Sequence, residues 1–209
     1  PFSDPVAEGI VIQKADERAL AAGTTTDKIF DMVESIQDKM HVPMVFMTYA
    51  NVIFVYGIEK FAKRSKEIGM SGVIIPDVPF EEKEEMDSVF SKYDLDVISL
   101  IAPTSHDRIQ EIAAEAKGFV YCVSSLGVTG MRSTINKGVA QMIEQVKKTK
   151  DIPCAIGFGI STPEQAKEMS EFSDGVIVGS AIVKLVETYG KECIKPVSEY
   201  VKSMKEAIS

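Results

Sequence analysis

Short apolar runs rich in β-branched residues recur along the chain, and they are continuous rather than alternating between apolar and polar positions. A continuous apolar run predicts a strand that is buried on both faces, as the strands of a parallel sheet are. We therefore expect six strands, at residues 44–48, 73–76, 97–101, 119–123, 154–157 and 176–178.

Between these runs lie segments whose apolar residues have helical spacing and whose opposite faces are charged. They cover residues 26–40, 57–68, 81–92, 105–115, 138–148 and 162–170. Ser105 and Thr162 provide capping hydroxyls before two of these segments, and Pro163 suits the first turn of a helix. The alternation of strand and helix predicts βαβ units and hence an α/β fold with a parallel sheet.

The number of expected strands bears on the kind of α/β fold. A closed barrel has eight strands in about 250 residues, and a β1-α1-β2 portion of about 50 residues before Pro1 would complete that count. We therefore expect a (β/α)8 TIM barrel as one domain over residues 1–209, without its N-terminal β1-α1-β2 portion. A doubly wound nucleotide fold is disfavoured, because the sequence has neither G-x-G-x-x-G nor G-x-x-x-x-G-K-[ST].

Composition narrows the classes of function. A net charge of −8 and a pI near 4.9 disfavour nucleic acid and anionic membranes as partners. The sequence has no uncharged apolar run of 18 residues and no secretion signal, so a membrane location is not expected. Cys122, Cys154 and Cys193 are too scattered for a disulfide framework or a C-x-x-C metal site, which indicates reduced thiols in the cytoplasm.

Glycine-containing turns follow the last two expected strands. Gly157 and Gly159 follow one strand, and Gly179 with Ser180 follows the next. Backbone N–H groups at such turns can approach a phosphate closely, and a helix that starts there adds a favourable dipole. In (β/α)8 barrels the loops after strands seven and eight hold phosphate. Two such turns after consecutive strands predict a binding site for a small phosphorylated substrate.

Six segments, taken in order, resemble the tryptophan synthase alpha chain family. They read PFSDP at residues 1–5, YAN at 49–51, PDVP at 76–79, LGVTG at 126–130, GFGIS at 157–161 and GSAIV at 179–183. The resemblance spans nearly all of the 209 residues. It implies a cytoplasmic lyase of tryptophan biosynthesis that cleaves indole-3-glycerol phosphate to indole and glyceraldehyde 3-phosphate.

The same resemblance implies a partner and the place of the cofactor. The indole would pass to a tryptophan synthase beta chain in an alpha2-beta2 heterotetramer, and pyridoxal phosphate would belong to that beta chain. This chain would need no cofactor and no metal of its own.

The resemblance also assigns catalytic residues. It places the family's principal glutamate, the general acid and base, upstream of Pro1. A second acidic position, which engages the indole N–H, maps onto Glu8, where the family pattern has aspartate. Tyr121 would line the catalytic pocket. A solvated loop carboxylate at Glu8 and a core tyrosine at Tyr121, hydrogen-bonded internally, are the structural alternatives.

Further positions carry substrate or phosphate contacts by resemblance. Tyr49 ends the third strand of the expected barrel, and Phe158 would pack on the substrate. Thr129 would bond the Glu8 loop when a mobile lid, residues 124–136, closes over the substrate. The family has arginine at the position of Ser125, so a lid contact is lost there. The phosphate would lie against Gly130, Gly159, Gly179 and Ser180.

Two other functions stay open at this level. The chain could be a non-catalytic partner that binds a phosphate ligand and regulates a beta chain, because the principal glutamate is not among the 209 residues. It could instead be a sugar-phosphate epimerase or isomerase, which would need metal-binding histidines or a pair of strand-end aspartates. Asp77 follows a strand but has no matching aspartate in the sequence.

Overall fold

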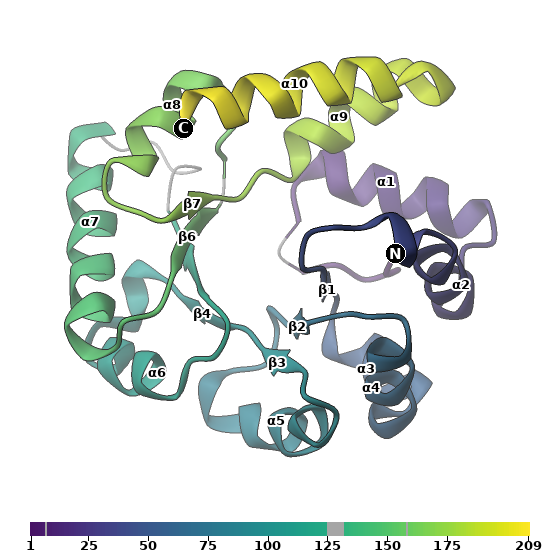
Figure 1. Ribbon diagram of the computed structural model, residues 1–209, viewed down its shortest axis with the longest axis horizontal. Coiled ribbons are helices and arrows are strands. Elements are labelled where there is room, and N and C mark those ends of the chain that lie inside the picture. The colour runs from purple at the N-terminus through teal and green to yellow at the C-terminus, as the bar shows by residue number, and fades with distance from the viewer. Residues whose placement is uncertain (7, 125–131, 158) are drawn as a thin grey trace. The chain divides into compact units, whose positions relative to one another are not determined.

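The computed structural model describes residues 1–6, 8–124, 132–157 and 159–209 (Figure 1). These residues form two compact units. The first contains Pro1–Glu8 and Gln13–Ile98, and the second contains Gly9–Ile12 and Ser99–Ser209. Helix α1, Ile10–Ala21, contributes residues to both units.

The first unit has a parallel sheet with the strand order β1-β2-β3. Its strands are β1 (Val45–Met47), β2 (Gly72–Ile74) and β3 (Asp96–Val97), and Gly72 is aligned with Val45 on one side and with Asp96 on the other. The α-helices are α2 (Thr26–Ile36), α3 (Ala50–Tyr56), α4 (Ile58–Glu67) and α5 (Lys83–Phe90). Single 3-10 turns occupy Gln37–Lys39, Phe80–Glu82 and Ser91–Tyr93.

An aromatic cluster forms the centre of the first unit. Phe30 of α2 and Phe61 of α4 meet edge to face with ring centroids 5.1 Å apart, and Phe46 of β1 contacts both. Phe30 and Phe61 are buried, so each removes a large apolar surface from water. This packing fixes α2 and α4 against β1.

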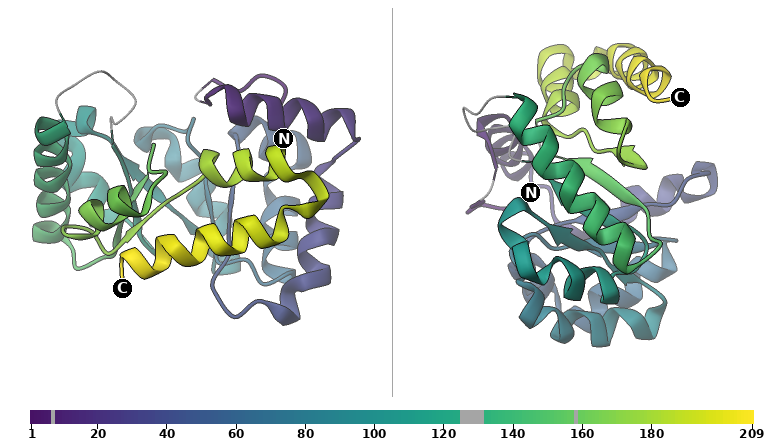
Figure 2. Two further views of the ribbon diagram at one scale, coloured as in Figure 1. Left: turned by 90° about the horizontal axis from the view of Figure 1, so that it is seen from above. Right: turned by 90° about the vertical axis from the view of Figure 1, so that its left-hand side faces the viewer.

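The second unit has a parallel sheet with the order β4-β5-β6-β7. Its strands are β4 (Ser99–Ile101), β5 (Val120–Val123), β6 (Cys154–Gly157) and β7 (Gly175–Val176). Helices α6 and α7 cover one face of β4, β5 and β6 (Figure 1), and α10 lies alongside α8 and α9 (Figure 2). The helices are α6 (Ile109–Glu115), α7 (Arg132–Thr149), α8 (Pro163–Ser170), α9 (Ser180–Tyr189) and α10 (Ile194–Ala207), with 3-10 helices at Pro103–Arg108 and Gly190–Glu192.

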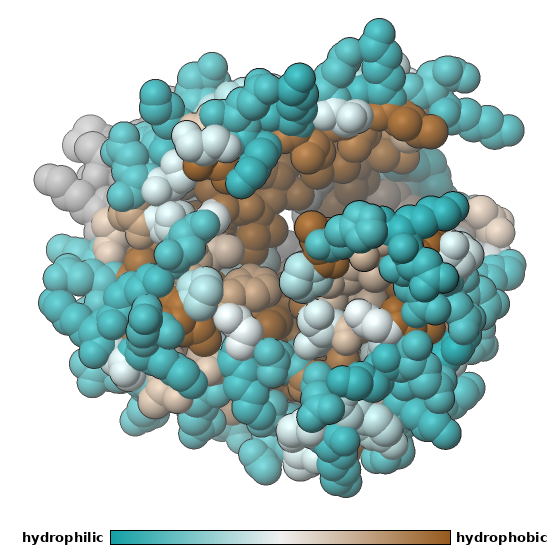
Figure 3. Space-filling model, in the orientation of Figure 1, coloured by the Kyte–Doolittle hydropathy of each residue, from teal (hydrophilic) through white to brown (hydrophobic). Residues whose placement is uncertain are grey.

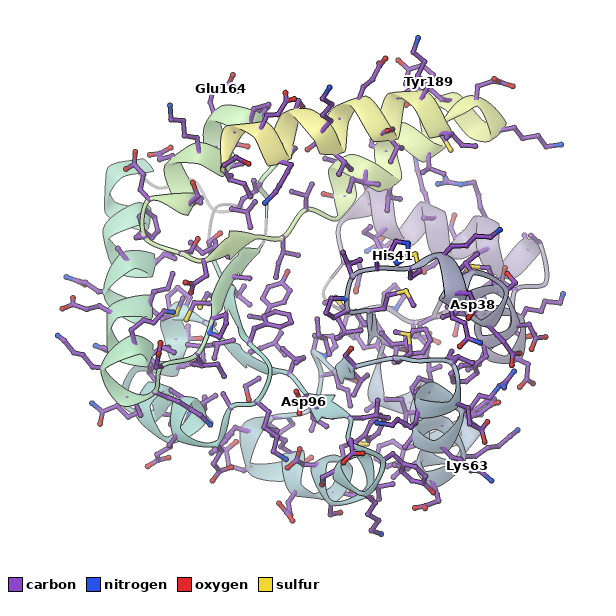
Figure 4. All side chains as sticks on the ribbon, viewed as in Figure 1. Asp38, His41, Lys63, Asp96, Glu164 and Tyr189 are labelled. Atoms are coloured by element: carbon purple, nitrogen blue, oxygen red, sulfur yellow. The ribbon has the colours of Figure 1, made fainter. Side chains whose placement is uncertain are left out.

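The start of α8 shows how the sequence specifies a helix boundary. The side chain of Thr162 accepts a hydrogen bond from Gln165 N, and Gln165 reaches back to Thr162 N, which completes a capping box. Pro163 occupies the first turn, where its missing N–H costs nothing. The carboxylate of Glu164 points away from the ribbon (Figure 4). It lies in the first turn of α8, where the positive end of the helix dipole stabilises a negative charge. The predicted start at Thr162 is confirmed.

The α/β class and the parallel pairing are confirmed, and several predicted boundaries are wrong. The run at 97–101 is divided into β3 and β4, with Ile98 between them. Ser105 lies inside a 3-10 helix and accepts no bond at the start of α6, whose cap position is Arg108. Residues 132–136 of the expected lid belong to α7. Helices α1, α3, α9 and α10 were not among the predicted segments.

Strand order within each sheet follows chain order without reversal. A doubly wound sheet contains a point at which the order reverses, so this pairing favours the single direction of winding of a (β/α) barrel.

Apolar surface gathers along α9 and α10 (Figure 3), where Val186, Ile194 and Val201 are exposed. Over the residues that the structure describes, none of the helices is long and apolar enough to cross a membrane.

Candidate functional site

Glu8 is held by Tyr49. Tyr49 lies two residues after β1, takes the cap position of α3 and is buried. Its hydroxyl donates a hydrogen bond to Oε2 of Glu8 and accepts one from the backbone N–H of Val6 at 3.1 Å. A carboxylate that accepts such a bond has a fixed position, so the alternative of a freely solvated side chain at Glu8 does not fit.

The loop that carries Glu8 is fixed at two further points. The ring of Phe2 packs on that of Tyr49 with centroids 5.0 Å apart. The side-chain amide of Gln13, in the first turns of α1, donates to the backbone carbonyl of Glu8 at 2.9 Å. These contacts place a half-buried carboxylate at the carboxyl end of β1.

Asp16 is a second carboxylate beside this loop that the motifs did not indicate. Burial raises the pKa of Asp16, and the charge of Glu8 acts in the same direction. The N-terminal ammonium group and the N–H of Phe2 oppose the rise. The sequence could have indicated Asp16 through its spacing from Gln13, because residues three apart share a face of a helix.

Asp77 has a structural role. Its carboxylate accepts the backbone N–H of Ala50 through Oδ1 at 3.0 Å and Oδ2 at 3.3 Å. This satisfies an N–H group at the start of α3 that has no partner within the helix. The described residues include no group of three or more His, Cys, Asp or Glu side chains placed to hold a metal ion. The isomerase alternative, which needed Asp77 for chemistry, gains no support.

Tyr121 and Gly157 lie together in the second unit. Tyr121 of β5 is buried, and that burial raises the pKa of its phenol. Its ring lies against Gly157 of β6, where a Cβ would collide with the phenol. The backbone N–H and the hydroxyl of Ser124 both donate to the carbonyl of Gly157, at 2.9 and 3.1 Å. Ser124, the first residue of the expected lid, is therefore anchored to β6.

The predicted phosphate-binding residues lie at turns, as the sequence suggested. Gly159 has a φ of 81°, which L side chains rarely adopt. Gly179 is the cap residue of α9, and Ser180 begins that helix. A Cβ added to Gly179 would meet nothing within 4 Å, so the space next to the first N–H groups of α9 is open. The N–H groups of Ile182 and Val183 donate to the carbonyl of Gly179. The N–H groups that precede them at the start of the helix point out of its end and can bind an anion.

Three predicted contacts, and the position of Ser125, cannot be placed. Phe158, Thr129, Gly130 and Ser125 lie outside the described residues. The remaining predicted residues form separate groups within their own units: Glu8 and Tyr49 in the first, and Tyr121, Gly159, Gly179 and Ser180 in the second.

A cavity of about 440 Å³ also occurs in the first unit, and neither Glu8 nor Tyr49 is among its lining residues. Its walls are mostly apolar and include Phe2, Phe46, Asn51 and Tyr56. Burial, followed by a hydrogen bond to Asp27, raises the pKa of Tyr56 to about 12. Among the described residues that line it, none carries a side-chain carboxylate. Size alone does not make it the reaction site.

Comparison with known proteins gives a consistent result. The family model described as tryptophan synthase alpha chain matches residues 1–209. The chain is 45% identical over 208 residues to the tryptophan synthase alpha chain of Lacticaseibacillus casei, covering 100% of this chain and 78% of that protein. A solved structure of tryptophan synthase subunit alpha from Legionella pneumophila str. Paris has a TM-score of 0.88 at 36% identity, with coverage of 100% and 79%. A tryptophan synthase complex from Pyrococcus furiosus has a TM-score of 0.87 at 30% identity, with coverage of 99% and 84%.

Proposed function

Because the chain belongs to the tryptophan synthase alpha chain family, its reaction is the lyase cleavage of indole-3-glycerol phosphate, and we propose that Glu8 accepts the indole N–H. The products are indole and glyceraldehyde 3-phosphate. The observation that carries the role of Glu8 is its hydrogen bond from Tyr49, which holds the carboxylate at the carboxyl end of β1.

The cleavage reaction requires two acidic groups. Cleavage of the bond between the ring and the glycerol chain requires protonation at indole C3 and support for the charge that develops at N1. One carboxylate cannot serve both atoms at once. Glu8 serves N1, and a positioned carboxylate in this role contributes about 10²-fold or more to the rate.

We assign the group that acts at C3 to a glutamate upstream of Pro1. In this proposal the 209 residues are part of a single (β/α)8 barrel domain whose β1-α1-β2 portion carries that glutamate. The sequential, parallel strand order within each unit supports a barrel. Tyr121 lines the catalytic pocket, and burial raises the pKa of its phenol.

The phosphate of the substrate binds at the turns of the second unit. Gly159, Gly179 and Ser180 supply backbone N–H groups together with Gly130, and the open space next to Gly179 supports this assignment. Phe158 packs on the substrate, and Thr129 closes towards the loop of Glu8. Tyr49 orients Glu8 through the hydrogen bond described above, in addition to any contact with substrate.

We further propose that the chain works in the cytoplasm within an alpha2-beta2 assembly. The Pyrococcus furiosus relative was solved as a tryptophan synthase complex, which supports a beta chain as partner. Pyridoxal phosphate belongs to that partner, and this chain needs no cofactor for a retro-aldol cleavage.

The test measures indole release from indole-3-glycerol phosphate by the protein that contains these residues, with a beta chain present. Glu8→Gln is expected to keep substrate binding and to lower kcat by about 10²-fold. Glu17→Gln is the matched control, because Glu17 is an exposed carboxylate of α1. Equal kcat values for Glu8→Gln and Glu17→Gln would remove Glu8 from the mechanism.

A further inference from the structure

Two cysteine thiols meet inside the second unit, and the lyase reaction uses neither of them. Cys122 belongs to β5 and Cys154 to the neighbouring β6. In the parallel register Val120 is aligned with Cys154 and Cys122 with Ile156, so the cysteines are diagonal neighbours. Aligned residues, and residues two apart on one strand, share a face of a sheet, so both side chains lie on the same face.

Both thiols face the side of the sheet that lies opposite Tyr121. Side chains alternate along a strand, and Tyr121 lies against Gly157 on the other face. Cys122 is 0% exposed and Cys154 is 1% exposed. Val139, Ile143 and Val146 of α7 are also buried, so the thiols occupy a dry layer between strands and helices.

Charged groups flank Cys154. Lys147 of α7 forms an ion pair with Asp174 at 2.7 Å, and the carboxylate of Asp174 accepts the backbone N–H of Cys154 at 2.7 Å. The hydrogen bond from Cys122, together with the charge of Lys147, lowers the pKa of Cys154. The same hydrogen bond and burial raise the pKa of Cys122. The thiol of Cys154 itself donates to the carbonyl of Ile152 at 3.7 Å.

Strand geometry limits what this pair can do. Neighbouring strands lie about 4.8 Å apart and rise about 3.3 Å per residue, which puts diagonal Cα atoms about 8 Å apart. A disulfide needs Cα atoms within about 7 Å unless the backbone moves. Two metal–sulfur bonds of about 2.3 Å each let the sulfurs lie about 4.6 Å apart, so a bridging ion fits where a disulfide does not.

We propose that Cys122 and Cys154 form a two-coordinate site for a soft monovalent cation of the Cu(I) type. Thiolates select such ions, whereas Zn(II) requires four ligands. The described residues include no group of three or more His, Cys, Asp or Glu side chains that could supply them. Binding replaces both thiol protons: one Cu⁺ and two S–H groups give an S–Cu–S anion of charge −1 and two released protons. Lys147 lies beside Cys154 but is paired with Asp174, so the site as a whole gains this charge of −1.

The test supplies Cu(I) to the reduced full chain as its bathocuproine disulfonate complex and follows loss of the chelator's colour, with native mass spectrometry for stoichiometry. The wild type and Cys193→Ala are expected to take up one Cu(I) each. Cys193 is the matched control because it is free and lies apart from the pair, at the cap of α10. Cys122→Ala and Cys154→Ala are expected to lose at least about 100-fold in affinity, since each leaves one thiolate.

Two further measurements are independent of how well the variants fold. X-ray absorption at the copper edge of the wild type should show two sulfur neighbours. Treatment with diamide, a thiol oxidant, should leave the Cys122–Cys154 pair reduced. Copper uptake that survives Cys122→Ala, uptake lost in Cys193→Ala, a copper environment without two sulfurs, or ready formation of a Cys122–Cys154 disulfide would each overturn the proposal.

Discussion

The phenol of Tyr121 occupies the space in which a side chain of Gly157 would begin. A Cβ at Gly157 would come closer than 3.0 Å to three atoms of that phenol, a separation that real Cβ atoms essentially never show. Gly157 does not have a positive φ. Glycine is therefore required at this position by the approach of Tyr121 and not by backbone conformation.

Gly157→Ala should displace Tyr121. Overpacking of this kind costs about 1–3 kcal/mol of unfolding free energy, and a displaced pocket residue should lower kcat/KM for indole-3-glycerol phosphate by about tenfold or more. Urea denaturation and the indole assay measure the two effects. Adding Tyr121→Leu should restore stability without restoring activity.

Gly138→Ala is the control for this substitution. Gly138 lies in α7, and an added Cβ there meets nothing within 4 Å. Replacing a helical glycine by alanine should stabilise by up to about 1 kcal/mol and leave kcat unchanged. If Gly157→Ala behaved in the same way as Gly138→Ala, the ring of Tyr121 would have to be free to move.

Tyr49→Phe tests whether the orientation of Glu8 matters. The variant removes the hydroxyl that donates to Glu8 and accepts from Val6, but keeps the ring that packs on Phe2. We expect kcat to fall by about tenfold with little change in KM, because a misplaced carboxylate stabilises the transition state less well.

The matched control is Tyr93→Phe. Tyr93 also donates to a carboxylate, that of Glu59, but this pair is exposed and far from the loop of Glu8 in the sequence. Its loss should leave kcat unaltered. An unchanged kcat in Tyr49→Phe, alongside a strong effect of Glu8→Gln, would show that Glu8 needs no help from Tyr49.

The strands could be predicted because their signal is local. Cys154–Gly157 was predicted with the correct bounds, since its apolar run is continuous and ends at a glycine. The division of residues 97–101 could not be predicted, because Asp96–Val97 pairs with β2 and Ser99–Ile101 with β5. Which neighbour a strand pairs with depends on tertiary structure, and the apolar pattern is the same in both halves.

The sequence named candidate residues for the site but could not give their contacts. The motif around Glu8 indicated a functional carboxylate, but its bond to Tyr49 joins residues 41 positions apart. Asp77 stood in a motif and still proved to be a cap for α3, because its neighbour Ala50 is distant in the sequence. Pairing between distant loops requires the folded sheet that aligns the strand ends.

Gly179→Val separates phosphate binding from folding. A Cβ at Gly179 meets no neighbour, so valine has room there and should keep the fold, although the φ of −115° and ψ of −80° lie outside the α and β regions and cost some backbone energy. Its methyl groups should obstruct the N–H groups at the start of α9, and glycerol 3-phosphate should bind at least about tenfold more weakly by calorimetry. Gly159→Ala gives the contrast: its φ of 81° predicts a loss of about 1 kcal/mol in unfolding free energy.

The ion pair between Lys147 and Asp174 should make stability depend on pH. Burial would raise the pKa of Asp174, but the hydrogen bond from Lys147 and the N–H of Cys154 outweigh it and lower that pKa. The pKa of Lys147 is raised, chiefly by the same hydrogen bond. A carboxyl group with a lowered pKa stabilises above its unfolded pKa of about 3.9, and an ammonium group with a raised pKa stabilises below about 10.4. The pair therefore stabilises between these limits.

Asp174→Asn should accordingly lower the unfolding free energy at pH 7 and have a much smaller effect near pH 2. Because 47% of the Asp174 side chain and 34% of the Lys147 side chain are exposed, solvent screening limits the loss to about 1 kcal/mol. Urea denaturation at both pH values measures this loss. A double-mutant cycle of Asp174→Asn with Lys147→Met separates the energy of the ion pair from that of the bond between Asp174 and Cys154 N. Lys148→Met is the surface control, since Lys148 pairs with Glu144 within α7 and both side chains are largely exposed. Asp174 follows α8 and precedes β7, while Lys147 lies in the last turn of α7, so this pair joins two βα units. An equal loss at pH 7 and pH 2 would mean that the carboxylate acts through its shape and not through its charge.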